Sequence, residues 1–244
     1  MKAAIQRLLG MAGYQLRRKY PRDFTLDDVT LMRRVEPFTR VTPEQLWGCV
    51  RAAEYIVQNQ VPGAVVECGV WKGGSVMAIA LTLLRLGDQA REVYLYDTFE
   101  GMTTPTEQDV DFEGRDAASQ IAVATDRVLG IEAYAPLEEA RANILGTGYS
   151  SANVHFVKGR VEDTLPAQAP EQIGLLRLDT DWYESTKHEL EHLFPRLSRG
   201  GVLMIDDYGH WRGVRQATDE YFARQALKPL LCRVDYASRM AVKL

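Results

Sequence analysis

The sequence predicts an α/β fold in which helices cover a doubly wound, mostly parallel sheet. Short apolar segments alternate with helical ones from residue 64 onward, as expected for strands joined by helical crossovers. A glycine-rich turn, Gly69–Ser75, leads from the first apolar segment into a helix, the usual first turn of such folds. Several apolar segments also end in an acidic residue. Ligands of open α/β sheets bind beyond the carboxyl ends of the strands, so these acids should line one edge of the sheet.

Residues 1–60 are predicted to form a helical arm or lid that packs on a main domain, residues 61–244. Thr42-Pro43-Glu44 supplies an N-cap and a proline at the first helical position, and a helix should follow from Gln45 to about Asn59. Phe24–Arg40 alternates turn signals with short apolar pieces, which is typical of an arm. The apolar faces of these helices need a partner, so we expect a homo-oligomer.

The main domain should contain five strands separated by helices and then a terminal pair of strands. The five expected strands are Val65-Val66, Glu92–Asp97, Val154–Lys158, Ile173–Asp179 and Gly201–Asp207. The expected helices are Ser75–Leu86, Asp116–Leu129, Leu137–Ile144, Glu184 to about Leu197, and Gly213–Gln225. Leu230–Asp235 and Met240–Leu244 lie close enough in the chain to form an antiparallel hairpin, so the sheet should have seven strands and be mixed at one edge. Phe99–Phe112 is a polar loop, long enough to suggest a function.

Composition excludes several classes of function. The chain has 244 residues, 46% of them hydrophobic, and a net charge of -4, which gives no electrostatic basis for binding nucleic acid. Its three cysteines are far apart and fit neither a disulfide framework nor a zinc site. No apolar run approaches the ~20 residues that span a bilayer. Gln6 and Arg7 interrupt what would be the apolar core of a secretory signal. We therefore expect a cytoplasmic protein that binds neither nucleic acid nor membranes.

The glycine-rich turn predicts a cofactor site. Asp97 ends the second strand, where a carboxylate can accept hydrogen bonds from both hydroxyls of a ribose. The turn lacks the G-x-G-x-x-G pattern that lets the backbone approach a dinucleotide pyrophosphate. S-adenosylmethionine carries no phosphate, and Glu67 at the strand end suits its amino group. We therefore predict S-adenosylmethionine as the cofactor. The alternative is a tight turn without a ligand, with Glu67 as a solvated strand end.

Asp179, Asp206 and Asp207 predict a metal site. Asp179 ends the fourth strand and the other two end the fifth. If these strands are neighbours, their ends lie about 5 Å apart, where three carboxylates repel one another unless a cation lies among them. Oxygen ligands without His or Cys favour Mg²⁺ or Ca²⁺. The alternative is that one aspartate of each group, or Asp181, caps the following helix.

The other reactive side chains give weaker indications. His210 follows the paired aspartates and is expected to touch the substrate or act as a base. His188 and His192 are spaced i,i+4 but lack a third ligand, so a solvated face is the preferred interpretation. Cys68 is expected to be a buried small residue. The sequence has neither a G-x-S-x-G elbow nor a Walker A pattern, which argues against a hydrolase and a phosphotransferase.

Five segments in a fixed order carry a family resemblance: Glu67–Ser75, Asp97–Met102, Gly159–Pro166, Asp179–Thr186 and Gly200–Tyr208. With them the chain resembles the TylF/MycF family of S-adenosylmethionine-dependent O-methyltransferases, the macrocin O-methyltransferase-like enzymes that methylate sugar hydroxyls of macrolides and aminocoumarins. The resemblance implies the Rossmann-like fold of class I methyltransferases and a Mg²⁺ site made by Asp179, Asp206 and Asp207. It implies a cofactor site made by Glu67, Gly69, Val70, Trp71, Ser75, Asp97, Thr98, Phe99, Gly159, Val161, Glu162, Asp163 and Asp179. Lys72 departs from the family pattern, which has Arg there, and Val161-Glu162 replaces bulkier residues at the expected adenine contact.

The predicted reaction is methyl transfer from S-adenosylmethionine to a hydroxyl of a sugar or another vicinal diol. The metal would position the acceptor and lower the pKa of its hydroxyl. Asp179 is the first candidate for the base, with His210 and Asp181 behind it. Residues 19–40, which include Glu36, and the Phe99–Phe112 loop are expected to close over a small-molecule acceptor.

Three alternatives remain open at this point. One is a catechol-type O-methyltransferase that acts on a vicinal diol or a phenol. Another is an NAD(P)-dependent oxidoreductase, because Tyr183 and Lys187 have the Tyr-x-x-x-Lys spacing although the glycine fingerprint is missing. The third is an adenosyl-binding protein without catalysis, which would have no use for three aspartates in a metal-like arrangement.

Overall fold

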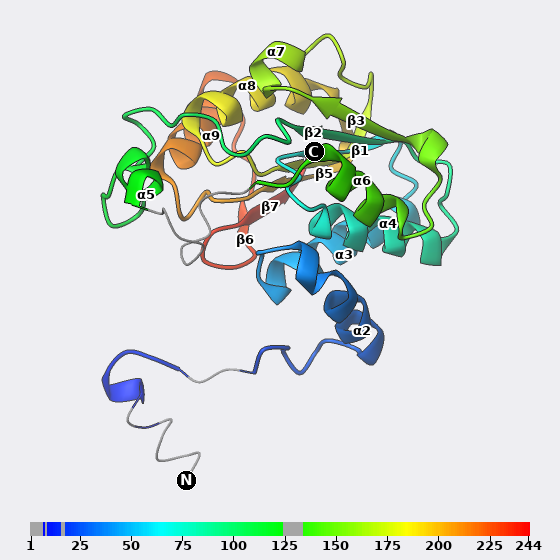
Figure 1. Cartoon of the computed structure of the whole chain (residues 1–244), viewed down its shortest axis with the longest axis horizontal. Coiled ribbons are helices and arrows are strands. Elements are labelled where there is room, and N and C mark those ends of the chain that lie inside the picture. Colours follow the sequence, from blue (N-terminus) through cyan, green and yellow to red (C-terminus); the bar gives the residue numbers. More distant parts are fainter. Residues whose placement is uncertain (1–6, 8, 16–17, 124–133) are drawn as a thin grey trace.

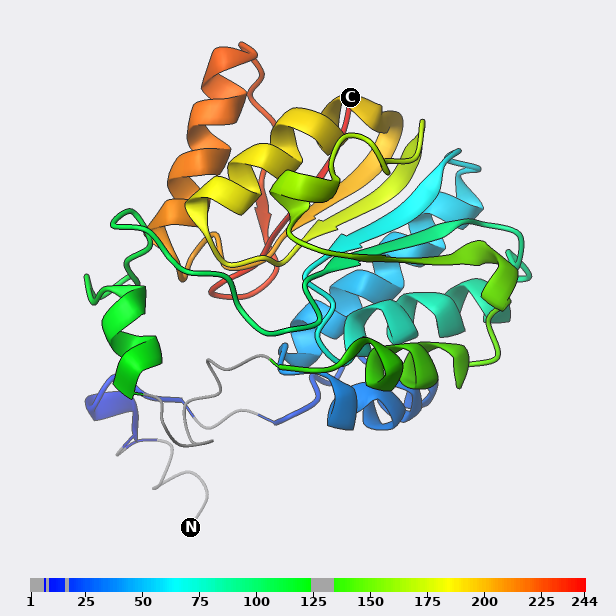
Figure 2. The same ribbon diagram turned by 45° about the horizontal axis from the view of Figure 1, so that its top comes forward.

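A seven-stranded sheet runs through the centre of the protein, between two layers of helices (Figures 1 and 2). This is a computed structural model, and it describes residues 7, 9–15, 18–123 and 134–244. The strands are β1 (Ala64–Cys68), β2 (Val93–Asp97), β3 (Val154–Lys158), β4 (Ile173–Leu178), β5 (Leu197–Ile205), β6 (Cys232–Arg233) and β7 (Arg239–Val242). Their order is β3-β2-β1-β4-β5-β7-β6. The first five strands are parallel, and β7 pairs antiparallel with both β5 and β6. The predicted mixed sheet with a terminal antiparallel pair is therefore confirmed.

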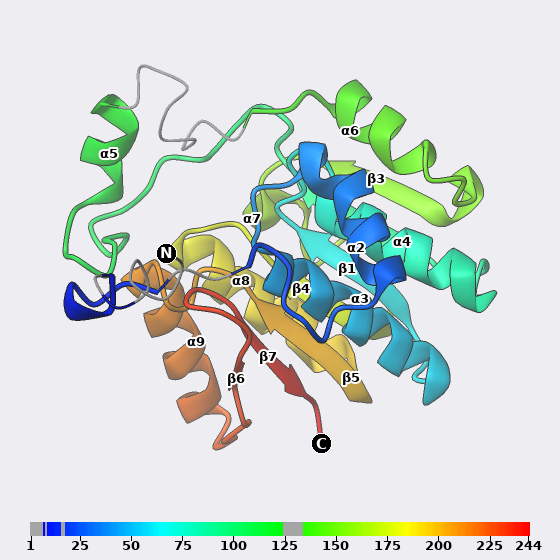
Figure 3. The ribbon, with the colours of Figure 1, turned by 90° about the horizontal axis from the view of Figure 1, so that it is seen from below.

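Each face of the sheet has its own apolar core and its own helices. One face is covered by α2 (Leu26–Val35), α3 (Pro43–Gln58), α4 (Gly74–Leu86) and α6 (Leu137–Leu145), and the other by α7 (Val161–Thr164), α8 (Tyr183–Leu193) and α9 (Arg212–Arg224). Successive residues of a strand point to opposite faces. Val65 accordingly lies in the core beneath α3 and α4, and Val66 in the core beneath α8 and α9. The short helix α5 (Ala117–Val123) stands outside both layers (Figure 3).

Part of the predicted arm is a regular helix. Thr25 caps α2 with a complete capping box, in which its side chain and that of Asp28 each accept a bond from the other's backbone N–H. Met32 and Val35, on one face of α2, are buried in the same core as the first strand. The turn signals in Phe24–Arg40 therefore mark the ends of a helix.

Two predicted element boundaries need comment. The helix expected to reach about Leu197 ends at Leu193, so that prediction is wrong by one turn. Strand β5 already begins at Leu197, because this residue pairs with Ile173 of β4 and is buried. The pairing then becomes irregular and resumes with Val202 opposite Leu175, so Gly200-Gly201 lies inside the strand. Of the helix expected over Asp116–Leu129, the part after residue 123 lies outside the described residues.

Among the described residues, no helix combines the length and the apolar character needed to cross a membrane.

Candidate active site

A cavity of about 360 Å³ opens at the carboxyl ends of β1, β2, β4 and β5. Most of the predicted site residues line it: Glu67, Gly69, Val70, Trp71, Ser75, Asp97, Thr98, Gly159, Val161, Glu162, Asp179, Asp181, Asp206, Asp207 and His210. Two predicted cofactor residues lie elsewhere. Phe99 is buried in the core against Phe156, and Asp163 is exposed on α7. The sheet thus brings together residues that are far apart in the chain, as the strand-end acids predict.

Hydrogen bonds to the side chain of Asp97 fix the turn after β1. One oxygen of its carboxylate accepts hydrogen bonds from the N–H groups of Val70, at 2.7 Å, and Trp71, at 2.9 Å. The other accepts from the N–H of Phe99 at 2.7 Å. Gly69 is required beside it, because a Cβ there would lie 1.9 Å from the carbonyl oxygen of Asp179, and its φ is +80°. Asp97 therefore joins the turns that follow β1 and β2 into one rigid wall of the cavity.

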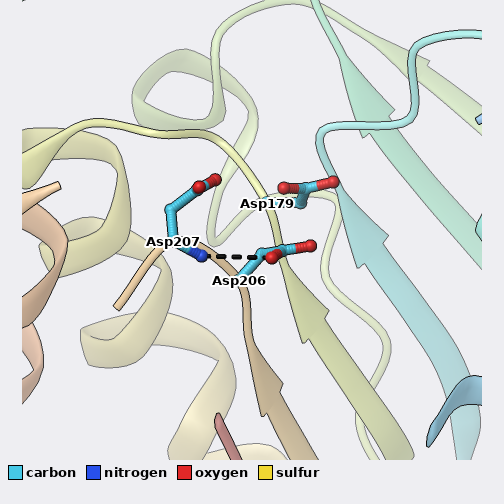
Figure 4. Close-up of side chains that lie close together, drawn as sticks. All are labelled: Asp179, Asp206 and Asp207. Atoms are coloured by element: carbon cyan, nitrogen blue, oxygen red, sulfur yellow. Dashed lines mark hydrogen bonds between the residues drawn. The ribbon is translucent and has the colours of Figure 1, made fainter. Parts of the chain in front are cut away.

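Asp179, Asp206 and Asp207 meet in the same cavity, at the ends of β4 and β5. One carboxylate oxygen of each lies within 4.8 Å of the others. Figure 4 shows the three side chains at the ends of β4 and β5, with the N–H of Asp207 donating to the carboxylate of Asp206 at 3.1 Å. The helix-capping alternative is contradicted, since the N-cap residues of α8 and α9 are Trp182 and Trp211 and not any of these aspartates.

Arg177 lies among these acids, and sequence reasoning missed it. Its guanidinium, 3% exposed on β4, donates to Glu67 at 2.6 Å, to Asp179 at 2.7 Å and to Asp206. The signal in the sequence was an arginine inside the otherwise apolar strand Ile173–Leu178. A buried charge requires a partner, so this residue alone indicated a cluster of acids nearby.

Gln45 of α3 is a second residue that sequence reasoning missed. Its side-chain oxygen accepts from the N–H of Thr42, which completes the capping box of α3. Its side-chain NH₂ donates to the carboxylate of Asp206. The sequence Thr42-x-x-Gln45 predicts the cap, and the contact with Asp206 depends on how α3 packs on the sheet.

The surroundings of Asp179, Asp181 and Asp207 raise the pKa values of their carboxyl groups. Burial raises the pKa of Asp179 well above its ordinary value, against the attraction of Arg177, and repulsion from Asp206 and Asp207 adds to the rise. Burial also raises the pKa of Asp207 well above its ordinary value, with a contribution from Asp181. The pKa of Asp181 is about 7 for the same two reasons, burial and the nearby charge of Asp179. Burial and mutual repulsion therefore disfavour the charged forms of Asp179, Asp181 and Asp207.

This donor set fits a hard divalent cation. Mg²⁺ and Ca²⁺ prefer carboxylate oxygens, and here three converge with no histidine or cysteine among them. A cation among them would offset the mutual repulsion and favour the ionised carboxylates, the form in which acids bind metals. A search of the described residues for acids, histidines or cysteines close enough together to hold a metal finds these three aspartates.

Aromatic side chains gather around His210, which lines the cavity together with Trp211 and Tyr236. The ring of His210 lies 4.7 Å from that of Trp211, 6.0 Å from that of Tyr236 and 5.7 Å from that of Phe112, measured between centroids. Burial lowers the pKa of His210, so its ring is neutral at pH 7. Phe112 and Tyr236 are 53% and 52% exposed. We call Phe112, His210 and Tyr236 the aromatic rim.

The predicted loop Phe99–Phe112 is anchored to the body of the protein. Asp109 is fully buried, and its carboxylate accepts from the N–H of Tyr183 at 2.7 Å. The N–H of Arg212 donates to the carbonyl of Val110 at 2.8 Å. The loop is thereby fixed to the first residues of α8 and α9, and Phe112 is held against His210 and Tyr236, which line the cavity.

A segment of the arm, residues 38–42, crosses the cavity on the side of the glycine-rich turn. Thr39 packs against the start of α4 so closely that a Cβ on Gly74 would lie 2.5 Å from its own Cβ. At the other end, Thr42 donates through its hydroxyl to Asp235 at 2.8 Å. Between them the guanidinium of Arg40 lies 4.5 Å from the centre of the Trp71 ring. Glu36 does not line the cavity and pairs with Lys19 and Tyr20.

The geometry contradicts the oxidoreductase alternative. The hydroxyl of Tyr183 donates to Glu220 at 2.8 Å, and Lys187 lies over the Tyr183 ring. Neither residue is among those that line the cavity. His188 and His192 contact each other edge to face, with ring centroids 4.3 Å apart, and are not among the residues that line the cavity either.

Comparisons with known proteins agree with this geometry. Residues 36–241 match the family model described as Macrocin-O-methyltransferase (TylF). Over 197 residues the chain is 37% identical to the 8-demethyl-8-(2,3-dimethoxy-alpha-L-rhamnosyl)-tetracenomycin-C 4'-O-methyltransferase of Streptomyces olivaceus, which covers 79% of this chain and 69% of that protein. It is 31% identical over 198 residues to the demethyldecarbamoylnovobiocin O-methyltransferase of Streptomyces niveus, with coverage of 81% and 72%.

Among solved structures, the O-methyltransferase NovP superposes with a TM-score of 0.72 at 30% identity, covering 84% of this chain and 82% of that chain. The match to the family model spans nearly all of the described sheet and the whole cavity. The chain therefore belongs to the macrocin-O-methyltransferase (TylF) family.

Proposed function

We propose that this protein transfers a methyl group from S-adenosylmethionine to a hydroxyl of a sugar, with Mg²⁺ bound by Asp179, Asp206 and Asp207. Membership of an O-methyltransferase family supports the methyl transfer and implies the cofactor. The name of the Streptomyces olivaceus relative, which modifies a rhamnosyl compound, supports a sugar as the acceptor. The observation that carries the proposal is the convergence of three aspartates beside the glycine-rich turn in one cavity.

The methyl donor would occupy the half of the cavity formed by β1 and β2. One oxygen of Glu67 is buried without a hydrogen-bond partner among the described residues, and it suits the amino group of the donor. Asp97 keeps an acceptor site for the ribose beyond its three backbone contacts. Val161 and Glu162 line the same half and are our candidates for the adenine contact.

The acceptor would lie between the aspartates and the aromatic rim. When bound, the cation would hold neighbouring acceptor oxygens and lower the pKa of the reacting hydroxyl. Asp179 is the first candidate base, because it follows β4, which lies between β1 of the donor half and β5, the strand that leads to the other two aspartates. It takes the hydroxyl proton as the oxygen attacks the methyl carbon, and the carbon–sulfur bond breaks to leave S-adenosylhomocysteine. His210 and Asp181 follow as candidates, since both line the cavity; burial lowers the pKa of His210 and raises that of Asp181 to about 7.

The aromatic rim would bind the apolar faces of the acceptor. Phe112 and Tyr236 are large, exposed and held on anchored turns, an arrangement that offers apolar surface to a ligand. Residues 38–42 and the Phe99–Phe112 loop would exclude water from the reacting groups.

A panel of acceptors with labelled S-adenosylmethionine tests the proposal. Glycosides, free sugars and catechols are offered with Mg²⁺ and with excess chelator. We expect methylation of a glycoside that requires the metal, and we expect Asp179→Asn to lose turnover while it still binds S-adenosylhomocysteine. Lys187→Ala, outside the cavity, serves as the control and should keep its activity. Full activity of Asp179→Asn, or of the wild-type enzyme in chelator, would contradict the metal mechanism, and preference for a catechol would favour the catechol-type alternative.

A further inference from the structure

Arg177 is a buried cation at the boundary between the two halves of the site. It lies on β4, between β1 and β5, and its backbone is in register with Glu67 on one side and Met204 on the other. Its side chain is 3% exposed. The neighbouring residues of β4 are buried leucines, so the rest of the strand offers no partner for a charge at this position.

One guanidinium binds three carboxylates that come from three different strands. Glu67 belongs to the donor half, and Asp179 and Asp206 belong to the proposed metal site. Arg177 binds one oxygen of each carboxylate. The second oxygen of Glu67 is the buried acceptor without a partner described above. The second oxygen of Asp206 accepts from Gln45 and from the N–H of Asp207.

Stability alone does not explain this arrangement. Buried ion clusters are costly to desolvate, and apolar residues of similar volume often replace them without loss of stability. The planar fork of arginine, with its five donors, can orient several carboxylates at once, which a lysine cannot do. A reaction between two bound ligands needs its groups held in fixed positions, and such positions depend on supporting contacts of this kind.

We propose that Arg177 is a positioning residue that orients Glu67 toward the methyl donor and Asp179 and Asp206 toward the cation. One side chain would then set the geometry of both halves of the site. The identity of the two ligands rests on the proposed function. The orienting role rests on the three ion pairs and on the unpartnered oxygen of Glu67.

Equilibrium binding to the whole protein tests this role without any turnover. Arg177→Met and Arg177→Lys are compared with the wild-type protein for S-adenosylhomocysteine, by calorimetry in chelator, and for Mn²⁺, by electron paramagnetic resonance without S-adenosylhomocysteine. We expect Arg177→Met to weaken both ligands, with a loss of roughly 10–100-fold for the metal, the usual effect of removing a supporting residue. Compared with Arg177→Met, Arg177→Lys should bind one of the two ligands more tightly, though still less tightly than the wild type, because a single ammonium cannot hold three carboxylates.

Arg91 offers a matched control. It is also a largely buried arginine, it pairs with Asp88 and donates to backbone carbonyls, and it lies outside the cavity. Arg91→Met should lower thermal stability and leave both affinities unchanged. If Arg177→Met does not fold, two other variants can replace it in the binding measurements. Arg177→Met/Glu67→Gln also neutralises one of the acids that would lose its ion pair, and Arg177→Lys keeps the positive charge.

A double-variant cycle separates orientation from a general loss of structure. Glu67→Gln should weaken S-adenosylhomocysteine in the wild-type background and have little further effect in the Arg177→Met background. The inference is overturned if Mn²⁺ binds Arg177→Met as tightly as the wild type or more tightly, because Arg177 would then be only a counter-charge. If the wild-type protein binds neither ligand, it is the proposed function that fails.

Discussion

Gln45 makes two contacts, and a substitution to glutamate would keep one and remove the other. Its oxygen completes the capping box of α3, and its NH₂ group donates to Asp206. Glutamate is an ordinary capping-box residue, so Gln45→Glu keeps the acceptor for the N–H of Thr42. The same substitution removes the donor to Asp206 and places a second carboxylate against it. The variant therefore tests the contact with Asp206 alone.

The size of the effect follows from two limits. A hydrogen bond to a charged group contributes about 1.5–3 kcal/mol, and Gln45→Glu loses one. Repulsion cannot cost more than protonating the new glutamate, which at pH 7 takes about 4 kcal/mol from an ordinary pKa near 4.3. We expect the free energy of unfolding to fall by roughly 2–4 kcal/mol at pH 7 in chelator.

The direction with pH follows from the same reasoning. In the folded variant the pKa of residue 45 lies above its unfolded value, so stability is present at low pH and is lost as the pH rises through the folded pKa. The deficit should therefore shrink at pH 5. A cation bound by the aspartates would also offset the repulsion, so Mg²⁺ should stabilise Gln45→Glu more than it stabilises the wild-type protein.

Urea unfolding followed by circular dichroism measures all three effects. Wild type and Gln45→Glu are compared at pH 7 and pH 5 in chelator, and at pH 7 with Mg²⁺. Gln89→Glu makes the same chemical change at an exposed site away from the cavity and should stay within about 0.5 kcal/mol of the wild type. Equal urea midpoints for wild type and Gln45→Glu at pH 7 in chelator would refute the role assigned to this amide.

Three further predictions address other parts of the molecule. Burial raises the pKa of Glu189 from 4.5 to about 8, so this residue should cost the wild-type protein stability as the pH rises between these values, and urea unfolding of Glu189→Gln should show a smaller loss than the wild type. Phe112→Ala should raise the KM for the acceptor several-fold in steady-state assays and leave S-adenosylhomocysteine binding unchanged, since Phe112 is half exposed and its ring contacts His210, which lines the cavity; an unchanged KM would exclude Phe112 from acceptor binding. Gly69→Ala would place a Cβ 1.9 Å from the carbonyl oxygen of Asp179, so we expect a lower melting temperature and weaker S-adenosylhomocysteine binding by calorimetry.

The strand-end acids show what local patterns can predict. Asp97, Asp179 and the pair Asp206-Asp207 each end an apolar segment, and parallel strands bring their carboxyl ends to one edge whatever their order. The cavity and its metal-like trio therefore followed from periodicity and residue type.

Contacts that depend on the order of the strands did not follow from the sequence. Arg177 meets Glu67 and Asp206 because β4 lies between β1 and β5, and no local pattern specifies that order. Gln45 reaches Asp206 because α3 packs at the ends of these strands, 161 residues away in the chain. The start of β5 was misplaced for a similar reason, since Leu197 is a strand residue through its pairing with Ile173.

The position of β7 has a consequence for the order in which the protein can be completed during synthesis. This late segment of the chain inserts between β5 and β6, and the preceding turn supplies Asp235, which binds Thr42 across 193 residues. A ribosome-bound chain that ends before residue 235 therefore lacks the anchor for the amino-terminal segment and one side of the aromatic rim. Contacts so distant in sequence also form slowly. The donor half can be assembled from residues made early, whereas the acceptor half has to wait until nearly the whole chain has emerged.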